Sequence, residues 1–387
     1  AAGNTLRREL RGISAEIHLR RTLMSVYKNN EMMARLDEFL PDIQRPARYI
    51  GGEVGACMKD KSQVDVRFAF CFPDTYEIGM SHLGMKILYG LKNRVPNYWC
   101  ERVFMPLPDM AEQMRARGIP LYALESLDPI REFDFIGFTV QYEMCYTTIL
   151  EMLDLAGVPV LSRERTALTP LVVAGGPCVC NPEPLADFID LFIIGEGEEV
   201  NLELMALMER CKRENASKED FLKRAAQIEG IYVPSLYDVE YNADGTVKSI
   251  TPRDGAPAQV RKRIIEDFDK VYAPDNFVVP FTGIVHDRAV VEVLRGCIRG
   301  CRFCQAGFTY RPVRPRSPQA LYRQAVESLE NSGCHEITLS SLSTSDYKWL
   351  PELAMEMQDY CTPRKINLSL PSLRADNFSR ELMLRLQ

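Results

Sequence analysis

The sequence has no long hydrophobic run, no excess of positive charge and no secretion signal. None of its apolar stretches approaches the roughly 20 residues that a membrane-spanning helix needs, so we expect no membrane contact. The net charge of -6 at pH 7 argues against electrostatic binding of nucleic acid by the protein surface as a whole, although a local basic patch could still bind it. The N-terminus lacks the charged, apolar and small-residue regions of a signal peptide. Together these absences favour a cytoplasmic protein.

The twelve cysteines do not indicate a disulfide framework, because domains that depend on disulfides are usually small and secreted. We therefore expect a reducing compartment. Most of the thiols lie singly in or beside apolar segments, where a free cysteine packs as a small hydrophobic side chain. We expect this role for Cys71, Cys145, Cys178, Cys180, Cys334 and Cys361.

The chain divides into four segments. Residues 1–63 begin with apolar residues at helical spacing and are expected to form a helical N-terminal segment. Residues 64–214 alternate short apolar strands, such as "VDVRFAFCF", "FDFIGFTV" and "LVVAGG", with helices, which predicts an α/β domain with a doubly wound parallel sheet of the Rossmann type. Residues 215–288 form a connector with a hairpin signal around an Asn-Ala-Asp-Gly turn. Residues 289–387 resume the alternation with three βα units, the last ending in a helix over 377–386.

Three cysteines are crowded into the loop after the first strand of this last segment. Cys297, Cys301 and Cys304 form the pattern C-x3-C-x2-C, at the strand end where βα loops converge. Structural zinc normally needs four N or S ligands, and no fourth Cys or His lies within a short loop of these three, so zinc is disfavoured. An iron-sulfur cubane held by three cysteines would leave one iron open to a ligand from outside the protein.

This loop resembles the radical S-adenosylmethionine (radical SAM) superfamily, whose signature is C-x3-C-x-aromatic-C, with Phe303 in the aromatic position. The resemblance implies a 4Fe-4S cluster on the three cysteines and S-adenosylmethionine on its open iron. An electron, from a donor such as a flavodoxin or ferredoxin, would then cleave the sulfonium to give a 5'-deoxyadenosyl radical. The superfamily's S-adenosylmethionine contacts would fall on Phe303, Ser340, Ser341, Ser372 and Arg374. Turn and helix-cap roles remain open for the serines.

The first α/β segment resembles the cobalamin-binding domain that precedes many radical SAM barrels. Asp74, Tyr76 and Gly79 match its motif D-x-H-x-x-G with tyrosine in the histidine position, and Gly175 and Gly176 stand where that fold keeps two glycines beside the corrin. The resemblance implies a bound cobalamin. A phenol is a poor cobalt ligand at neutral pH, so such a cobalamin would lack histidine ligation. We interpret His82, six residues further on, as a packed or surface histidine.

A basic loop follows the three cysteines. "YRPVRPRSP" places Arg311, Arg314 and Arg316 between prolines that stiffen the backbone. These guanidinium groups could hold a phosphate from a cobalamin tail or from an RNA substrate. A solvated loop with internal ion pairs is the alternative.

Longer stretches, including "RYIGGE", "FPDTYEIGMSHLGMKILY", "GGPCVCNPEPLADFIDLFIIGEGEE" and "CQAGFTYRPVRPRSP", resemble an uncharacterised bacterial family of radical SAM proteins with a cobalamin-binding domain, over roughly 45–387. The resemblance implies a radical enzyme that abstracts hydrogen and methylates its substrate through cobalamin. Radical modification of tRNA or rRNA, such as methylthiolation, and a non-catalytic scaffold or sensor are alternatives. Barrels of this superfamily have six βα units and three are present here, so we expect a truncated chain or a second chain that completes the barrel.

Overall fold

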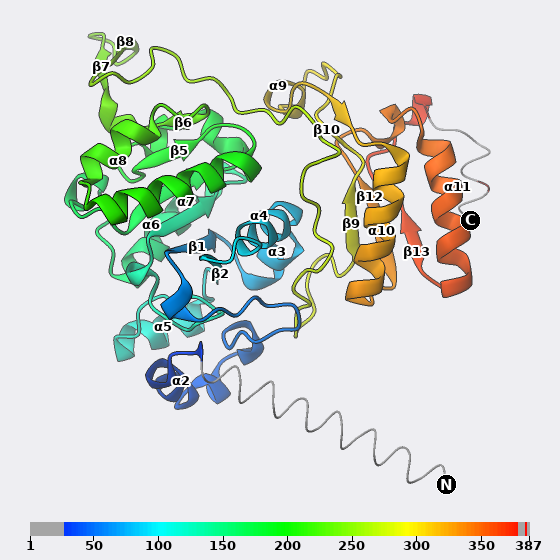
Figure 1. Cartoon of the computed structure of the whole chain (residues 1–387), viewed down its shortest axis with the longest axis horizontal. Coiled ribbons are helices and arrows are strands. Elements are labelled where there is room, and N and C mark those ends of the chain that lie inside the picture. Colours follow the sequence, from blue (N-terminus) through cyan, green and yellow to red (C-terminus); the bar gives the residue numbers. More distant parts are fainter. Residues whose placement is uncertain (1–26, 378–383, 385–387) are drawn as a thin grey trace.

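The computed structural model describes residues 27–377 and residue 384. The first described helix is α2 (Asn30–Asp37). Residues 1–26 of the helical segment expected over 1–63, and nearly all of the helix expected over 377–386, lie outside the described residues. Two separate hydrophobic cores divide the described chain into two bodies, which Figure 1 shows side by side.

The first body is built on a six-stranded sheet in the order β2-β1-β3-β4-β5-β6, in which all neighbours are parallel except β5 and β6. This confirms the predicted parallel α/β class. Helix α4 packs beside α7, and α5 packs beside α6. The strands are β1 (Val66–Phe72), β2 (Tyr98–Phe104), β3 (Phe135–Thr139), β4 (Leu171–Gly175), β5 (Leu191–Ile193) and β6 (Ile231–Tyr232). The helices are α3 (Tyr76–Ser81), α4 (Leu83–Asn93), α5 (Pro108–Arg117), α6 (Tyr146–Ala156), α7 (Gly197–Glu214) and α8 (Lys218–Ala225).

Strand β2 is missing from the strands that the sequence predicts. Its sequence, YWCERVF, interrupts an apolar run with Glu101 and Arg102. Both side chains are nevertheless buried, because Arg67 binds Glu101 at 2.6 Å and two carboxylates bind Arg102. A buried charged side chain needs a partner, and here the partners come from distant segments of the chain. The spacing of neighbouring residues in the sequence therefore does not show whether such a side chain is buried or exposed.

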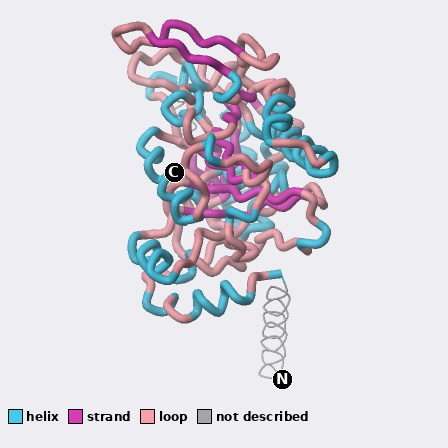
Figure 2. Tube along the Cα trace, turned by 90° about the vertical axis from the view of Figure 1, so that its left-hand side faces the viewer, coloured by secondary structure: helices cyan, strands magenta, loops and turns pink. Residues whose placement is uncertain are grey.

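A hairpin and an extended connector link the two bodies. β7 (Tyr237–Tyr241) and β8 (Val247–Pro252) form the antiparallel hairpin that the turn signal predicts, and Figure 2 shows it at one end of the molecule. The chain then runs between the bodies without regular strands or helices until β9. In this stretch the backbone N–H of Arg263 donates to the carbonyl of Ile194 at 2.9 Å, which attaches the connector to the end of β5.

The second body contains a three-stranded parallel sheet in the order β13-β12-β9, with its own core. Its strands are β9 (Ala289–Glu292), β12 (Glu336–Ser340) and β13 (Asn367–Ser369), and a short antiparallel pair is formed by β10 (Leu294–Arg295) and β11 (Arg314–Pro315). The helices are α9 (Ala306–Thr309), α10 (Pro318–Ser332) and α11 (Leu350–Cys361). Among the described residues, no helix is both long and apolar enough to cross a membrane.

Candidate functional site

A cavity of about 480 Å³ lies between the two sheets. Thr139, Gly175 and Ile193, at the carboxyl ends of β3, β4 and β5, line one side of it. Glu292 and Ser340, at the carboxyl ends of β9 and β12, line the other. Ligands of α/β folds bind outside the carboxyl ends of parallel strands, and here two such edges share one cavity. This cavity is the candidate functional site.

The two predicted glycines lie in the cavity wall, but for different reasons. Gly176 has a φ of 106°, and a Cβ there would lie 2.6 Å from the carbonyl oxygen of Val140, so the close approach of two backbone segments requires glycine. A Cβ on Gly175 would make an ordinary contact of 3.7 Å with Ile193. Both glycines line the cavity, but only at position 176 does the backbone leave no room for a side chain.

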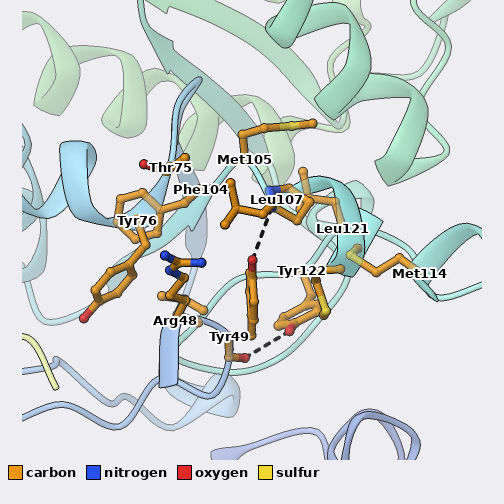
Figure 3. Close-up of a pocket in the computed structure, with 13 residues that line it drawn as sticks. Arg48, Tyr49, Thr75, Tyr76, Phe104, Met105, Leu107, Met114, Leu121 and Tyr122 are labelled. Atoms are coloured by element: carbon orange, nitrogen blue, oxygen red, sulfur yellow. Dashed lines mark hydrogen bonds between the residues drawn. The ribbon is translucent and has the colours of Figure 1, made fainter. Parts of the chain in front are cut away.

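The D-x-Y-x-x-G motif lies elsewhere. Asp74, Tyr76 and Gly79 all belong to the described chain and are not part of the cavity lining. Figure 3 shows Tyr76 in the wall of a small second pocket, and its buried hydroxyl donates a hydrogen bond to Glu53 at 2.9 Å. A Cβ on Gly79 would lie 2.3 Å from the ring of Phe104, so this glycine allows close helix-to-strand packing. In the structure Tyr76 thus makes a buried hydrogen bond and Gly79 a close packing contact, both outside the cavity.

His82, interpreted from the sequence as a packed or surface residue, lines the cavity. It precedes α4, and its Nδ1 accepts a hydrogen bond from the backbone N–H of Met85 at 3.2 Å. Burial lowers the pKa of His82, whereas a hydrogen bond with Gln141 raises it to a smaller extent. The imidazole is thus neutral near pH 7 and carries its proton on Nε2.

The three-cysteine loop begins at the edge of the cavity. Gly296, directly before Cys297, lines the cavity with a φ of 99°. The N–H of Cys297 donates to the carbonyl of Tyr310 at 3.0 Å, and the N–H of Cys304 donates to that of Cys301 at 3.0 Å. All three thiols are free and half-buried, and cysteine sulfur is the type of ligand that iron-sulfur clusters require. In the described part of the chain, no three Cys, His, Asp or Glu side chains lie together closely enough to hold a metal ion.

Phe303 and the predicted S-adenosylmethionine contacts fall into two groups. Ser340 and Ser341 line the cavity directly. Phe303 is 93% exposed, and Ser372 is exposed with a φ of 57°. Arg374 binds Asp376 at 2.6 Å through its guanidinium, and its backbone N–H donates to the Ser345 hydroxyl at 2.7 Å. The structure thus brings only the two serines at the end of β12 to the cavity.

The three arginines of the basic loop are separated. Arg311 lines the cavity and donates from Nε to the carbonyl of Gly307. Arg314 also lines it, but its guanidinium binds the Glu196 carboxylate in the first body. Arg316 is 1% exposed and stacks 4.1 Å from the Phe268 ring centroid. A common phosphate site formed by all three arginines is therefore not the arrangement that the structure has.

Two cationic residues of the cavity lining, Arg295 and Lys262, are not predicted from the sequence. Arg295 binds Glu292 through Nη2 at 2.9 Å. Burial lowers the pKa of this guanidinium, but the neighbouring carboxylates raise it by more, so the group stays charged. Lys262 donates from Nζ to the carbonyls of Thr309 at 2.9 Å and Arg311 at 2.6 Å. Arg295 could have been suspected from its place two residues before Cys297. Lys262 lies in the connector, where no motif marks it.

Comparison with known proteins identifies the first body. Residues 84–234 match the family described as "Radical SAM proteins, N-terminal". The matched residues run from α4 to just past β6 and so lie within the first body. This confirms the family resemblance that the sequence indicates.

Two curated proteins are similar to parts of this chain. The uncharacterized protein MJ0966 of Methanocaldococcus jannaschii is 28% identical over 318 residues, which cover 81% of this chain and 57% of that protein. The tRNA-2-methylthio-N(6)-dimethylallyladenosine synthase of Amoebophilus asiaticus is 36% identical over 63 residues, which cover 16% of this chain and 13% of that enzyme. The chain thus spans little more than half the length of the first relative.

A solved structure shares the fold. The cobalamin-dependent S-adenosylmethionine radical enzyme OxsB with aqua-cobalamin bound superposes with a TM-score of 0.50 at 14% sequence identity. The superposition covers 83% of this chain and 41% of that enzyme. It therefore extends over both bodies of the chain, and at this identity it shows the fold alone.

Proposed function

We propose that this chain is the cofactor-binding part of a radical SAM enzyme that also uses a cobalamin. The observation that carries the proposal is the shared cavity, where glycine-containing turns of one parallel sheet face Gly296 and Thr309, which flank the three-cysteine loop of the other body. A large cofactor on the first sheet and a cluster-bound cofactor on the second would meet there.

The residues of the second body would hold the cluster and orient S-adenosylmethionine. Cys297, Cys301 and Cys304 would bind three of the four irons as thiolates, with Ser340 and Ser341 hydrogen-bonding from the adjacent cavity wall. When bound, these cofactors supply a 5'-deoxyadenosyl radical that abstracts hydrogen from an unreactive carbon. A flavodoxin- or ferredoxin-like protein would deliver the electron, and a further segment or a second chain would complete the barrel.

The residues of the first body would hold the cobalamin. Gly175 and Gly176 keep the cavity wall free of side chains at the end of β4. His82 lies in the same cavity wall, where its Nδ1 accepts from the backbone N–H of Met85. A methyl group carried by such a cofactor could pass to a carbon that has lost hydrogen, which makes methylation of an unknown substrate the finer form of the proposal.

Anaerobic reconstitution tests the proposal. The chain would be loaded with iron, sulfide and hydroxocobalamin, and then analysed for bound iron, corrin absorbance and 5'-deoxyadenosine formation with S-adenosylmethionine. We expect about four irons per chain for a cubane, with loss of the cluster in a triple Cys→Ala variant at positions 297, 301 and 304. Zinc at these cysteines, or no metal, would contradict the proposal.

Radical modification of RNA is the second candidate. The short similarity to a tRNA-2-methylthio-N(6)-dimethylallyladenosine synthase supports it, as does Arg311 at the cavity. The net charge of -6 weakens it, because RNA binding normally draws on a basic surface. Retention of tRNA at about 0.15 M salt would favour this candidate, since nonspecific binding weakens steeply with salt.

A further inference from the structure

The three-cysteine loop is attached to the turn after β12 by one ion pair. Arg299 lies between Cys297 and Cys301, and its Nε donates to Oδ2 of Asp346 at 2.9 Å. A second hydrogen bond joins Nη2 of Arg299 to Oδ1 of the same carboxylate. The fork-to-fork geometry fixes both distance and orientation, which a single contact would not do.

The carboxylate also organises its own turn. The hydroxyl of Ser343 donates to Oδ2 of Asp346 at 2.8 Å, and the hydroxyls of Ser341 and Thr344 lie 2.9 Å apart. Hydrogen bonding from Arg299 lowers the pKa of Asp346, so the carboxylate is charged at neutral pH. The turn that presents Ser341 to the cavity and the loop that presents the cysteines therefore share one anchor.

The rest of the loop has few other restraints. Across residues 297–304, all of them described, the pair with Asp346 is the only salt bridge to another described residue. Backbone hydrogen bonds hold the loop at Cys297 and between Cys301 and Cys304. Arg302 and Phe303, by contrast, are exposed. Ordering a residue costs conformational entropy, so an anchor at the middle of the loop lowers the cost of gathering three thiols around a metal cluster.

We propose that Arg299 and Asp346 are positioning residues for the metal cluster. The pair holds the middle of the cysteine loop against the turn at 340–346, and it thereby couples cluster retention to the geometry of the neighbouring ligand site. The inference rests on the proposed function, because it presumes that Cys297, Cys301 and Cys304 bind a cluster.

The test compares four single variants with the wild-type chain, all reconstituted anaerobically with iron and sulfide. Arg299→Met and Asp346→Asn break the pair, Arg299→Lys keeps the charge without the fork, and Arg302→Met removes a charge from the same loop that has no salt bridge among the described residues. Loss of iron to a strong chelator and the electron paramagnetic resonance (EPR) signal of the reduced cluster are the two readouts. Thermal unfolding of the metal-free proteins separates positioning from misfolding.

We expect Arg299→Met and Asp346→Asn to lose iron about tenfold faster or more, as is typical when the residues that orient metal ligands are removed. Arg299→Lys should be intermediate, and Arg302→Met should match the wild type. The change in the EPR signal on adding S-adenosylmethionine should be smaller in Asp346→Asn. Unfolding temperatures of the metal-free variants should stay close to that of the wild type.

Two outcomes would count against different statements. If the wild type binds a cluster and both broken-pair variants retain iron as well as Arg302→Met does, the positioning role is wrong and the proposed function stands. If the wild type binds no cluster, the proposed function itself fails. If Asp346→Asn unfolds, the Arg299→Lys variant provides the test. The positioning role would be wrong if Arg299→Lys lost iron at the same rate as the wild type.

Discussion

Arg314 and Glu196 form a two-point ion pair across the cavity between the two bodies. Nη1 of Arg314 lies 2.6 Å from Oε2, and Nη2 lies 2.5 Å from Oε1, although the residues are 118 positions apart. Oε2 of Glu196 also accepts the backbone N–H of Ile265 at 2.6 Å, so the connector joins the same contact. Partial burial raises the pKa of Glu196, but the hydrogen bonds from Arg314 and Ile265 and the charges of Arg295 and Arg314 together lower it by more. One carboxylate therefore holds the first body, the connector and the second body together.

Breaking this pair should loosen the contact between the bodies. Arg314→Met leaves the Glu196 carboxylate partly buried without its main partner, and hydrogen bonds to charged groups contribute about 1.5–3 kcal/mol. We expect amide hydrogen exchange in residues 262–265 and 309–316 to become about tenfold faster, since about 1.4 kcal/mol corresponds to a factor of ten. Arg253→Met is the control, because Arg253 pairs with Asp238 only at the exposed hairpin. Unchanged exchange in both segments would show that the pair does not hold the bodies.

The buried pairs of Arg102 should dominate the stability of the first body. Arg102 is 2% exposed and binds Glu53 at 2.8 Å and Glu125 at 2.6 Å. Arg102→Met would leave two buried carboxylates unpaired, and losing one partner of a buried ion pair costs about 3–5 kcal/mol. Urea unfolding should show a loss of this size, against less than about 1 kcal/mol for Arg115→Met, whose pair with Glu151 is exposed. Equal losses in the two variants would contradict the prediction.

The sequence predicts the elements whose pattern is local. β1, β3, β4 and β5 are short apolar runs, and the structure has each of them buried in the first sheet. The three cysteines are likewise recognisable from spacing alone. The side-chain contacts of the charged pairs and of the D-x-Y-x-x-G motif cannot be predicted from such local patterns. Glu196 meets Arg314 only after folding, and Tyr76 hydrogen-bonds Glu53, which lies 23 positions earlier. Side-chain partners that come from distant segments leave no periodic signal.

A cobalamin bound in the cavity should not be ligated by a histidine of this chain. Tyr76 takes the motif's histidine position and lies outside the cavity lining, while Nδ1 of His82 is engaged by the Met85 N–H. We expect the EPR spectrum of bound cob(II)alamin to be the same whether the protein carries ¹⁴N- or ¹⁵N-histidine, and the same in His82→Gln. A nitrogen splitting that changes with the labelled histidine would contradict this prediction. His335→Gln serves as the matched control for loss of a histidine.

Because of Lys92, we expect the free energy of unfolding of the chain to change with pH in the alkaline range. The side chain is completely buried, its Nζ has no hydrogen-bond partner among the described residues, and it lies 4.2 Å from the Phe68 ring centroid and 4.7 Å from that of Phe70. Burial lowers its pKa from 10.5 to about 8. Between these two values the unfolded chain binds more protons than the folded one, so the stability contributed at this site rises with pH. Below about pH 8 the full cost of burying the charge remains.

Replacing the amine should therefore help most at neutral pH. At 1.36 kcal/mol for each pKa unit, Lys92→Met should gain up to about 3 kcal/mol at pH 7, because methionine retains most of the volume without a charge. The gain should shrink as the pH rises from 8 towards 10.5, the range between the folded and unfolded pKa values. Urea unfolding of both proteins across this range measures the difference, and Lys270→Met at an exposed position should stay within about 0.5 kcal/mol of the wild type. A gain that does not change with pH would mean that the methionine packs better and that the lysine charge is not the cause.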